Sequence, residues 1–268
     1  RCIYELYSLE VNRYVIHASG LRERFRLVFI SDLHGRVYGR GNEKLLSLII
    51  KEEPDAVFIG GDLIVSNRPD KDSAAYDFLA KVCEVAPVFY APGNHEKSLS
   101  SLRMFGERTK RFRREISRQG VTYLENHVAE LTEGILVAGL DMDYRFYKKI
   151  NPPKLTGVDL DGYLGKPGDN SYNILLAHDP KFFKVYAEQG WDLVLSGHCH
   201  GGSIRLPLVG GVISPQFRLF PKYSKGRYEL NGSIMIVSAG CGSHTINLRL
   251  FNRPEVTVVD IYDETQRI

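Results

Sequence analysis

The sequence predicts an α/β fold in which strands and helices are layered in a single domain spanning residues 1–268. Apolar, β-rich segments alternate with segments of helical spacing through the first half of the chain, which is typical of strand–helix–strand units around a buried sheet. The chain has 268 residues, 43% of them hydrophobic, so it can bury a large core. No repeat, low-complexity tract or linker divides the sequence into two parts.

The first half of the chain is expected to supply an edge hairpin, three strands and two helices. Residues 4–18 alternate between polar and apolar side chains, which predicts the edge hairpin. Helical spacing is found in residues 41–54, with Asn42 as the N-cap and Pro54 as the stop, and again in residues 70–86. The predicted strands are the apolar runs at residues 26–34, 55–62 and 87–95.

The second half changes to strands joined by short turns. Residues 151–170 are rich in Pro, Gly and Asp, which predicts a loop. Residues 98–119 form the most basic stretch of the chain; a solvated helix face is the simpler interpretation, and a surface for anionic head groups or substrate is the alternative. The predicted strands lie at residues 134–141, 172–180, 192–202, 233–242 and 255–263.

Composition excludes several classes of protein. The net charge of +3 is too small to indicate a stable nucleic-acid partner by itself. No apolar run approaches the roughly 20 residues that a membrane-spanning helix needs. The chain begins at Arg1 rather than Met, so one expectation is that a signal or anchor segment has been removed. Such a segment would associate an otherwise soluble domain with a membrane. The cysteines contain no C-x-x-C pair and are expected to be free thiols: Cys2, Cys83, Cys199 and Cys241.

Metal-binding side chains follow five of the predicted strands, at the point where each strand ends. Because the loops at the carboxyl ends of neighbouring strands in an open α/β sheet share one crevice, we expect these side chains to converge. Taken alone, each has a structural explanation, such as a helix cap for Asp32, a turn for Asp62 or Asn94, and a packed histidine for His178. The side chains are Asp32, His34, Asp62, Asn94, His95, His178, His198 and His200.

The segment G-H-C-H is the strongest single signal among them. Two imidazoles at His198 and His200 can both reach one site only if the backbone turns sharply, and Gly197, Gly201 and Gly202 are expected to permit that turn. Apart from His95, the donors comprise four imidazoles, two carboxylates and one amide oxygen. This set suits divalent Mn, Fe, Zn, Ni or Co, with Mn favoured, and it exceeds what one tetrahedral ion uses. Two ions that share a bridging carboxylate account for the number.

The order D-x-H, G-G-D, G-N-H-E, a lone His and G-H-x-H across residues 30–202 resembles the calcineurin-like metallophosphoesterases. The tail, with GHCHGGSIRLPLVGG, FPKYSKGRY and LRLFNRPEVTVV, is similar to the bacterial YkuE-like and YaeI-like branch, some relatives of which hydrolyse UDP-2,3-diacylglucosamine. The resemblance implies a four-layer α/β/β/α sandwich with two central mixed sheets flanked by helices.

Carried over position by position, the resemblance implies two metal positions. One ion would be held by Asp32, His34 and His200, and Asp62 would bridge the two ions. His95 would be a general acid or a phosphate-binding imidazole, so the expected catalytic residues are His95 and Asp62. The other ion would be held by Asn94, His178 and His198.

Four positions depart from the family pattern. Glu96 stands where many relatives have Asp, which leaves a carboxylate in place with a different reach. The other three, Cys199, Ser203 and Ala239, stand where Thr, Gln and Arg are expected and bear on substrate contacts rather than on metal binding. Cys199 alternates with two ligands and is expected to face away from them as a small packed residue.

Asp179, which follows His178, has two interpretations. It is either a carboxylate that supports a metal ligand or the first residue of the turn before Pro180.

The expected function is dinuclear-metal-dependent hydrolysis of phosphoester bonds by direct attack of a metal-bridging hydroxide, with His95 assisting the leaving oxygen. Phosphodiester or pyrophosphate bonds in lipid-linked or cell-envelope substrates are favoured, together with peripheral membrane association. The alternatives are a nucleotidase, nuclease or phosphomonoesterase, and less favoured a non-catalytic metal-binding scaffold. A protein phosphatase typically has Arg before G-N-H-E, where this chain has Ala91 and Pro92. The sequence predicts no oligomeric state.

Overall fold

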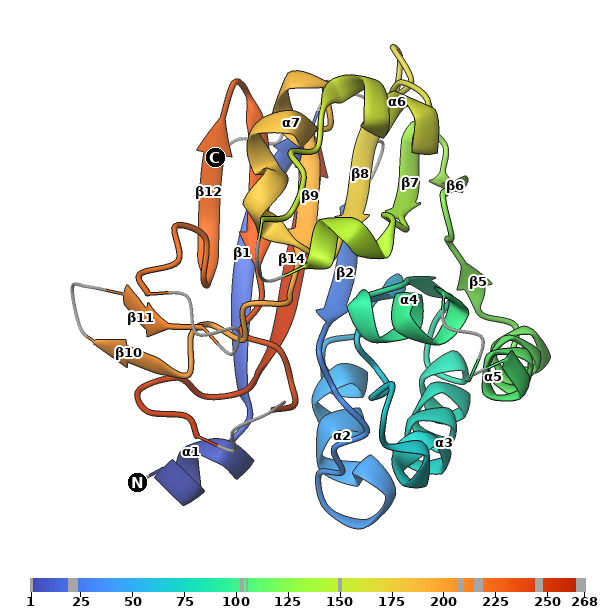
Figure 1. The fold of residues 1–268 in the computed structure, drawn as a ribbon, viewed down its shortest axis with the longest axis vertical. Helices are drawn as coiled ribbons and strands as arrows, with labels where there is room; N and C mark the ends of the chain where they lie inside the picture. Colours follow the sequence, from blue (N-terminus) through green and yellow to red (C-terminus); the bar gives the residue numbers. More distant parts are fainter. Residues whose placement is uncertain are drawn as a thin grey trace.

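The computed structural model describes residues 2–18, 24–101, 104, 106–148, 151–206, 210–214, 219–243 and 248–263. Within these residues, two six-stranded sheets pack against each other and helices cover their outer faces (Figure 1). The strand order is β1-β14-β2-β3-β4-β5 in the first sheet and β12-β13-β9-β8-β7-β6 in the second. Each sheet contains both parallel and antiparallel pairs, so the prediction of two mixed sheets is confirmed.

The first sheet has parallel strands at its centre. Strand β3 is buried at every position, as expected for a parallel strand that is covered on both faces. The strands of this sheet are β1 (Glu10–Ala18), β2 (Phe25–Ile30), β3 (Ala56–Gly60), β4 (Val88–Ala91), β5 (Thr122–Tyr123) and β14 (Glu255–Asp263). The helices on this side are α2 (Glu43–Lys51), α3 (Asp72–Cys83), α4 (Asn94–Ser101) and α5 (Gly106–Arg118).

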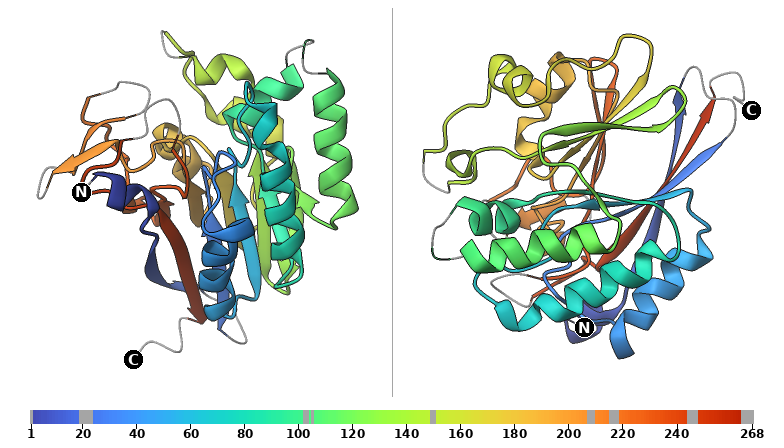
Figure 2. Two further views of the ribbon diagram at one scale, coloured as in Figure 1. Left: turned by 90° about the horizontal axis from the view of Figure 1, so that it is seen from below. Right: turned by 90° about the vertical axis from the view of Figure 1, so that its right-hand side faces the viewer.

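The second sheet also has a parallel centre, formed by β7, β8, β9 and β13. Its outer face is covered by α6 (Gly157–Leu164) and α7 (Phe183–Glu188), on the side opposite to α2, α3 and α5 (Figure 2). The strands are β6 (His127–Thr132), β7 (Ile135–Leu140), β8 (Tyr172–Ala177), β9 (Leu193–Ser196), β12 (Gly226–Leu230) and β13 (Ser233–Val237).

Three apolar layers hold the four structural layers together. Along β2, Val28 and Ile30 face the helices while Leu27 and Phe29 face the second sheet, because alternate side chains of a strand point to opposite faces. Leu27 and Phe29 pack with side chains of the second sheet such as Leu176. A third cluster joins the second sheet to α6 and α7. This is the four-layer sandwich that the resemblance implied.

The predicted hairpin at residues 4–18 is wrong. Residues Cys2–Tyr7 form helix α1, and only Glu10–Ala18 is a strand. That strand pairs in parallel with β14 at nine positions, from the opposite end of the chain. An alternating pattern predicts a strand with two unlike faces, but it carries no information on which distant segment pairs with it.

Two other local predictions also need correction. Asn42 lies at the N-terminus of α2, but its side chain accepts a hydrogen bond from the backbone N of Tyr38 (2.8 Å) and does not cap the helix. The predicted loop at residues 151–170 contains α6, which begins with a capping box. In that box Asp159 N donates to Thr156 Oγ1 (3.2 Å), and Thr156 N donates to Asp159 Oδ2 (2.9 Å).

A small hairpin of β10 (Ile204–Leu206) and β11 (Gly210–Ile213) stands beside the main sheets, close to α1 (Figures 1 and 2). Cys83, Cys199 and Cys241 are free thiols, as predicted, and the side chain of Cys2 lies outside the description. No helix among the described residues combines the length and the apolar character needed to cross a membrane.

Candidate metal centre

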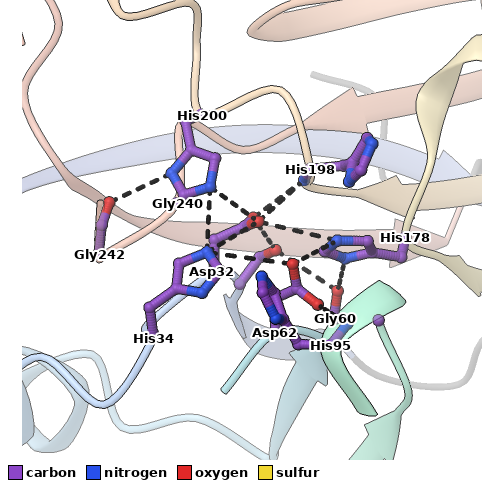
Figure 3. A network of polar contacts seen from close by, with 12 residues as sticks. Asp32, His34, Gly60, Asp62, His95, His178, His198, His200, Gly240 and Gly242 are labelled. Carbon is purple, nitrogen blue, oxygen red and sulfur yellow. Dashed lines mark hydrogen bonds and ion pairs between the residues drawn. The ribbon is translucent and has the colours of Figure 1, made fainter. Parts of the chain in front are cut away.

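The carboxyl ends of β2, β3, β4, β8 and β9 meet at one edge of the two sheets. The structure brings together all eight side chains that the sequence singled out there. Figure 3 shows the labelled ones among them converging, with the carboxylates of Asp32 and Asp62 among the imidazoles. Asp32 is fully buried, and Asp62 is 2% exposed. Convergence therefore follows from parallel strands ending in loops at the same edge.

Five of these residues have left-handed backbones, which aim their side chains inward. This conformation costs an L-residue about 1 kcal/mol or more, and it persists only where the surroundings enforce it. Here Asp32 N donates to Gly61 O (3.0 Å), and His34 N donates to Asp62 O (2.9 Å). The φ values are 53° for Asp32, 51° for His34, 53° for Asp62, 66° for His198 and 48° for His200.

The glycines of G-H-C-H-G-G act in two different ways. Gly201 and Gly202 have φ of 71° and 80°, so they supply the sharp turn as predicted. Gly197 does not. A Cβ on Gly197 would collide with Ser31 Oγ and Asp32 Oδ2, so this glycine is required for the close approach of β9 to the end of β2.

The first cluster consists of Asp32, His34 and His200. His200 Nε2 lies 3.3 Å from Asp32 Oδ1 and 3.1 Å from His34 Nε2. The other ring nitrogen of His200 lies 3.2 Å from the carbonyl oxygen of Gly242. Because a carbonyl only accepts, Nδ1 of His200 carries the proton and the Nε2 lone pair faces the centre.

The second cluster consists of Asp62, His178 and His198, with Asn94 beside them. His178 donates through Nδ1 to the carbonyl of Gly60 (2.7 Å), and its Nε2 lies 3.2 Å from Asp62 Oδ2. One terminal atom of the Asn94 amide lies 2.8 Å from His198 Nδ1 and 3.2 Å from Asp62 Oδ2. When that atom is the amide oxygen, three lone-pair donors face one another with no proton between them, which is the arrangement a cation requires.

The two clusters share carboxylates. Asp62 Oδ2, close to His178, also lies 4.0 Å from His34 Nε2 of the first cluster. Asp32 Oδ1, close to His200, also lies 3.8 Å from His178 Nε2 of the second cluster. The second oxygen of Asp62 accepts a hydrogen bond from the backbone N of His95 (2.8 Å), which fixes the carboxylate. This geometry fits two ions with a carboxylate between them.

The electrostatics of the site also favour cations. Burial opposes the charge of Asp62, yet the imidazoles of His178, His95 and His34 hold the pKa of its carboxyl well below the usual range. Burial would lower the pKa of His178, but Asp62 and Asp32 raise it to about 10. Burial lowers the pKa of His198 to about 4, so this imidazole is neutral, as metal binding requires. Ionised carboxylates and the neutral imidazole of His198 suit a divalent metal, whereas His178 has to release its proton before it can bind one.

His95 lies at the start of α4 and is buried. Its Nδ1 accepts a hydrogen bond from the backbone N of Ser66 (3.0 Å), and Ser66 Oγ lies at the same distance. Since a backbone N–H only donates, the proton of a neutral His95 is on Nε2. The ring stands at 87° to that of His34, with centroids 5.1 Å apart. Sequence analysis missed Ser66 because nothing in its surroundings marks it.

Glu96 belongs to the framework of the site, not to either metal cluster. Its carboxylate accepts hydrogen bonds from the backbone N of Asp62 (2.9 Å), of Gly93 (2.9 Å) and of Ile64 (3.3 Å), and from the hydroxyl of Tyr90 (2.7 Å). Burial, followed by the charge of Asp62, raises the pKa of Glu96. Glu96 thus ties the loop after β3 to the loop after β4.

The structure confirms one of the two interpretations of Asp179, the turn before Pro180. Its Oδ1 accepts from the backbone N of Lys181 (3.1 Å) at the start of the turn. Its Oδ2 lies 3.9 Å from His198 Nε2, on the side of the ring away from Asn94. At 3.9 Å this contact is too long for a hydrogen bond, and the same oxygen pairs with Lys181 Nζ (2.6 Å), so the support of a metal ligand by Asp179 stays a prediction.

Arg249 is a further supporting residue that sequence analysis missed. Its side chain is buried, and Nη2 donates to the carbonyls of Ala239 (2.8 Å), Gly240 (3.1 Å) and Gly242 (2.6 Å). The last of these carbonyls also accepts from His200. An arginine was expected at position 239, where the structure has a buried Ala239.

A pocket of about 210 Å³ adjoins the second cluster. Cys199 is buried and lines this pocket next to His198. Ser203 instead lies at the start of the small hairpin, where its backbone N donates to Ile213 O (2.8 Å). The pocket is lined by Tyr147, Asp179, Pro180, Lys181, His198, Cys199, Ser214, Pro221, Lys222 and Tyr223.

Comparisons with known proteins agree with this geometry. Residues 25–202 match the family model of the calcineurin-like phosphoesterases. Phosphodiesterase YaeI of Escherichia coli is 29% identical over 88% of this chain and 82% of its own length. The uncharacterized metallophosphoesterase YkuE of Bacillus subtilis is 28% identical over 95% of this chain and 86% of its own.

A solved structure shares the fold. Sulfate thiohydrolase SoxB of Thermus thermophilus, in complex with glycerol, superimposes with a TM-score of 0.51 at 13% identity. The match covers 91% of this chain and 58% of the SoxB chain, and at this identity it shows the fold alone. The family match covers more than half of the sequence and includes every strand end that forms the candidate centre. This chain belongs to the calcineurin-like phosphoesterase family and is a metal-dependent phosphoester hydrolase.

Proposed function

We propose that the chain is a dinuclear-metal phosphodiesterase or pyrophosphatase in one domain, with Mn as the favoured ion. One ion would be held by Asp32, His34 and His200, and the other by Asn94, His178 and His198, with Asp62 between them. The observation that carries the proposal is the pair of donor clusters that share Asp62 and Asp32.

The residues around the ions have distinct tasks. When bound, the two ions supply a nucleophilic hydroxide near neutral pH and offset the charge of the phosphoryl group. His95, with its Nε2 proton fixed by Ser66, donates to the leaving oxygen or to a phosphoryl oxygen. Such proton donation accelerates hydrolysis by roughly 10²–10⁴-fold. Glu96 and Arg249 hold the loops that carry the ligands.

A lipid-linked substrate and peripheral membrane association are the finer part of the proposal. The name of the relative YaeI supports a phosphodiester bond. Exposed apolar side chains next to the pocket support a lipid: Leu219 and Phe220, 68% and 62% exposed, directly precede the lining residue Pro221. Leu206 of the small hairpin and Phe251 beside it are also exposed. Amphiphilic substrates favour such surfaces because apolar area removed from water stabilises the complex.

Reconstitution with metals tests the proposal. The chelated protein is loaded with Mn, Zn, Fe, Ni or Co, its metal content is measured, and turnover of phosphomonoesters, phosphodiesters, nucleotide pyrophosphates and lipid-linked diesters is compared. We expect about two ions per chain and a preference for diesters or pyrophosphates. A preference for nucleoside monophosphates would instead identify a nucleotidase.

His95→Ala separates the chemistry from metal binding. We expect full metal content with turnover lowered by roughly 10²–10⁴-fold. Unchanged turnover would remove His95 from the reaction. A metal-loaded wild type without any turnover would identify a binding scaffold.

A further inference from the structure

Three successive residues at the end of the G-H-C-H-G-G segment have left-handed backbones. The φ values are 48° for His200, 71° for Gly201 and 80° for Gly202. Glycine adopts this conformation freely, but a histidine keeps it only where its surroundings enforce it. The imidazole of His200 therefore reaches the first cluster only while other groups hold this turn.

The side chain of Asn252 holds the turn. It is 1% exposed, and its Nδ2 donates to the carbonyls of His200 (2.7 Å) and Gly202 (2.5 Å). A Cβ on Gly201 would lie 2.3 Å from Asn252 Oδ1, so the amide packs directly against the turn. Because both carbonyls share one donor, the loss of this amide would release the two ends of the turn together.

Helix α1 and the residues after it hold Asn252 in place. Glu5 is 5% exposed, and its Oε2 accepts from the backbone N of Asn252 (3.2 Å). The next residue, Arg253, donates through Nε to Ser8 O (3.0 Å) and through Nη2 to Leu9 O (2.9 Å). The contacts therefore run from α1 through Asn252 to the left-handed turn.

Helix α1 also contacts the loop that carries His34. The guanidinium of Arg36 lies 4.5 Å from the centre of the Tyr7 ring, and its Nη1 donates to Ser243 Oγ (3.0 Å). Ser243 follows Gly242, whose carbonyl holds the other imidazole of the first cluster (Figure 3). Side chains that are not ligands thus connect α1 to the loops of both histidines in this cluster.

The second cluster depends less on α1. His178 and Asn94 follow β8 and β4, and His178 is held by the carbonyl of Gly60 (2.7 Å). The backbone N of His198 donates to Asp32 Oδ2 (3.0 Å), so this end of the G-H-C-H segment has its own support. A change in α1 is therefore expected to affect the two clusters unequally.

On the basis of the proposed function, we propose that Asn252 and Glu5 are positioning residues for the ion of the first cluster, and that α1 sets the affinity of this cluster for its ion. Neither side chain is a ligand; each fixes the backbone from which His200 reaches the ion. Groups that orient metal-binding imidazoles change metal affinity by about 10–100-fold. Displacement of α1 would thus lower turnover by releasing one ion.

Metal-binding curves of the chelated protein test the proposal. Asn252→Ala is expected to weaken the binding of one ion by about 10–100-fold and to leave the other as in the wild type. Asn252→Asp keeps the shape but turns an acceptor toward two carbonyls, so the loss is expected to be at least as large. Saturating metal is expected to restore the kcat of Asn252→Ala, which a general loss of stability would not allow.

Variants with one cluster disabled identify the ion. His178→Ala removes a ligand of the second cluster, and adding Asn252→Ala is expected to weaken the remaining ion by the same factor as in the wild type. His200→Ala removes a ligand of the first cluster, and adding Asn252→Ala is expected to have no further effect on the remaining ion.

Matched variants control for indirect effects. Glu5→Ala removes an acceptor and is expected to weaken the ion of the first cluster by about two- to tenfold. Glu5→Gln keeps an acceptor oxygen and is expected to behave as the wild type. Tyr4→Ala, at a side chain of the same helix that is 69% exposed, is expected to leave both affinities unchanged. If Asn252→Ala fails to fold, the contrast between Glu5→Ala and Glu5→Gln decides the matter.

The outcomes distinguish this proposal from the proposed function. Wild-type affinities for both ions in Asn252→Ala and Glu5→Ala would overturn the positioning roles, even if the enzyme is active. Equal weakening of both ions would overturn them as well, because it would indicate a general loosening of the site. A wild type that binds two ions without turnover would refute hydrolysis alone, and the binding curves would still decide the roles of Asn252 and Glu5. A wild type that binds no metal would refute both proposals.

Discussion

Arg108 on α5 joins the loop after β3 to the first residue of α3. Its Nε and Nη2 bind the two oxygens of Asp72 at 2.7 and 2.6 Å, and Nη2 also donates to Val65 O (2.8 Å). Nη1 donates to the carbonyl of Ser66. The side chains are 13% exposed for Arg108 and 5% for Asp72. Because Ser66 N–H fixes the ring of His95, Arg108 positions the proposed acid from a distance.

Arg108→Met tests this arrangement because it keeps the length of the side chain and removes its charge and donors. Asp72 would then be a buried carboxylate without its partner, a change that costs about 3–5 kcal/mol. At roughly 2–4 °C per kcal/mol, the melting temperature is expected to fall by roughly 6–20 °C. Two backbone carbonyls also lose a donor, so the loop that carries Ser66 is expected to loosen.

The assays are denaturant unfolding and turnover with two leaving groups. Turnover is expected to fall more for a phosphoester with an alkoxide leaving group than for one with a p-nitrophenolate leaving group. The reason is that a poor leaving group depends more on the proton from His95. Arg113→Met is the matched control on the same helix. The side chain of Arg113 is 49% exposed and that of its partner Glu125 is 28% exposed, so this pair is less buried than Arg108 and Asp72. The expected loss in the free energy of unfolding is about 1 kcal/mol or less.

A double variant completes the test. Arg108→Met with Asp72→Asn removes the buried charge together with its partner, so it is expected to be more stable than the sum of the single changes predicts. If the free energy of unfolding of Arg108→Met lies within about 0.5 kcal/mol of the wild-type value, or if the effects of the two changes add up, Arg108 and Asp72 are not coupled as described.

Three further predictions concern the metal centre and its support. Chelation is expected to lower the melting temperature, and metal added back at 100 times its Kd is expected to restore about 2.7 kcal/mol of the free energy of unfolding. Scanning fluorimetry checks this, and an unchanged melting temperature would mean that the ions do not bind the folded protein. Glu96→Ala leaves buried backbone N–H groups at Asp62 and Gly93 without their acceptor, so we expect a loss of about 3 kcal/mol or more in denaturant unfolding, and a loss under 1 kcal/mol would contradict this framework role. Arg249→Met is expected to weaken the binding of one ion by about 10–100-fold in a metal titration, since Gly242 loses the donor that holds it against His200. Affinities for both ions equal to those of the wild type would exclude the effect.

The central strands and the position of the site could be predicted from sequence because both depend on local patterns. A parallel strand covered on both faces is a continuous apolar run, as in β3, and the polar residues after such runs must share an edge. The structure brings those residues together, while their assignment as ligands and acid remains a prediction. Helix α6 was missed because Pro and Gly around Thr156 obscured its capping box.

The supporting residues could not be predicted, because their partners are distant in sequence. Arg108 is 36 positions from Asp72, and Ser66 is 29 positions from His95. Nothing near either residue differs from an ordinary surface loop or basic helix. Strand β1 was misassigned for the same reason, since its partner β14 lies at the other end of the chain. Such pairs are selected by packing, which a one-dimensional pattern does not encode.

The left-handed backbones of Asp32, His34, Asp62, His198 and His200 limit how this site can be redesigned for another cation. Asn, Asp and His tolerate that conformation best after Gly, whereas β-branched residues are strongly disfavoured there. Exchanges among Asp, Asn and His should therefore retain the fold while changing the hardness of the donor set. Val, Ile or Thr at the same positions would disturb the main chain before any metal preference could be measured.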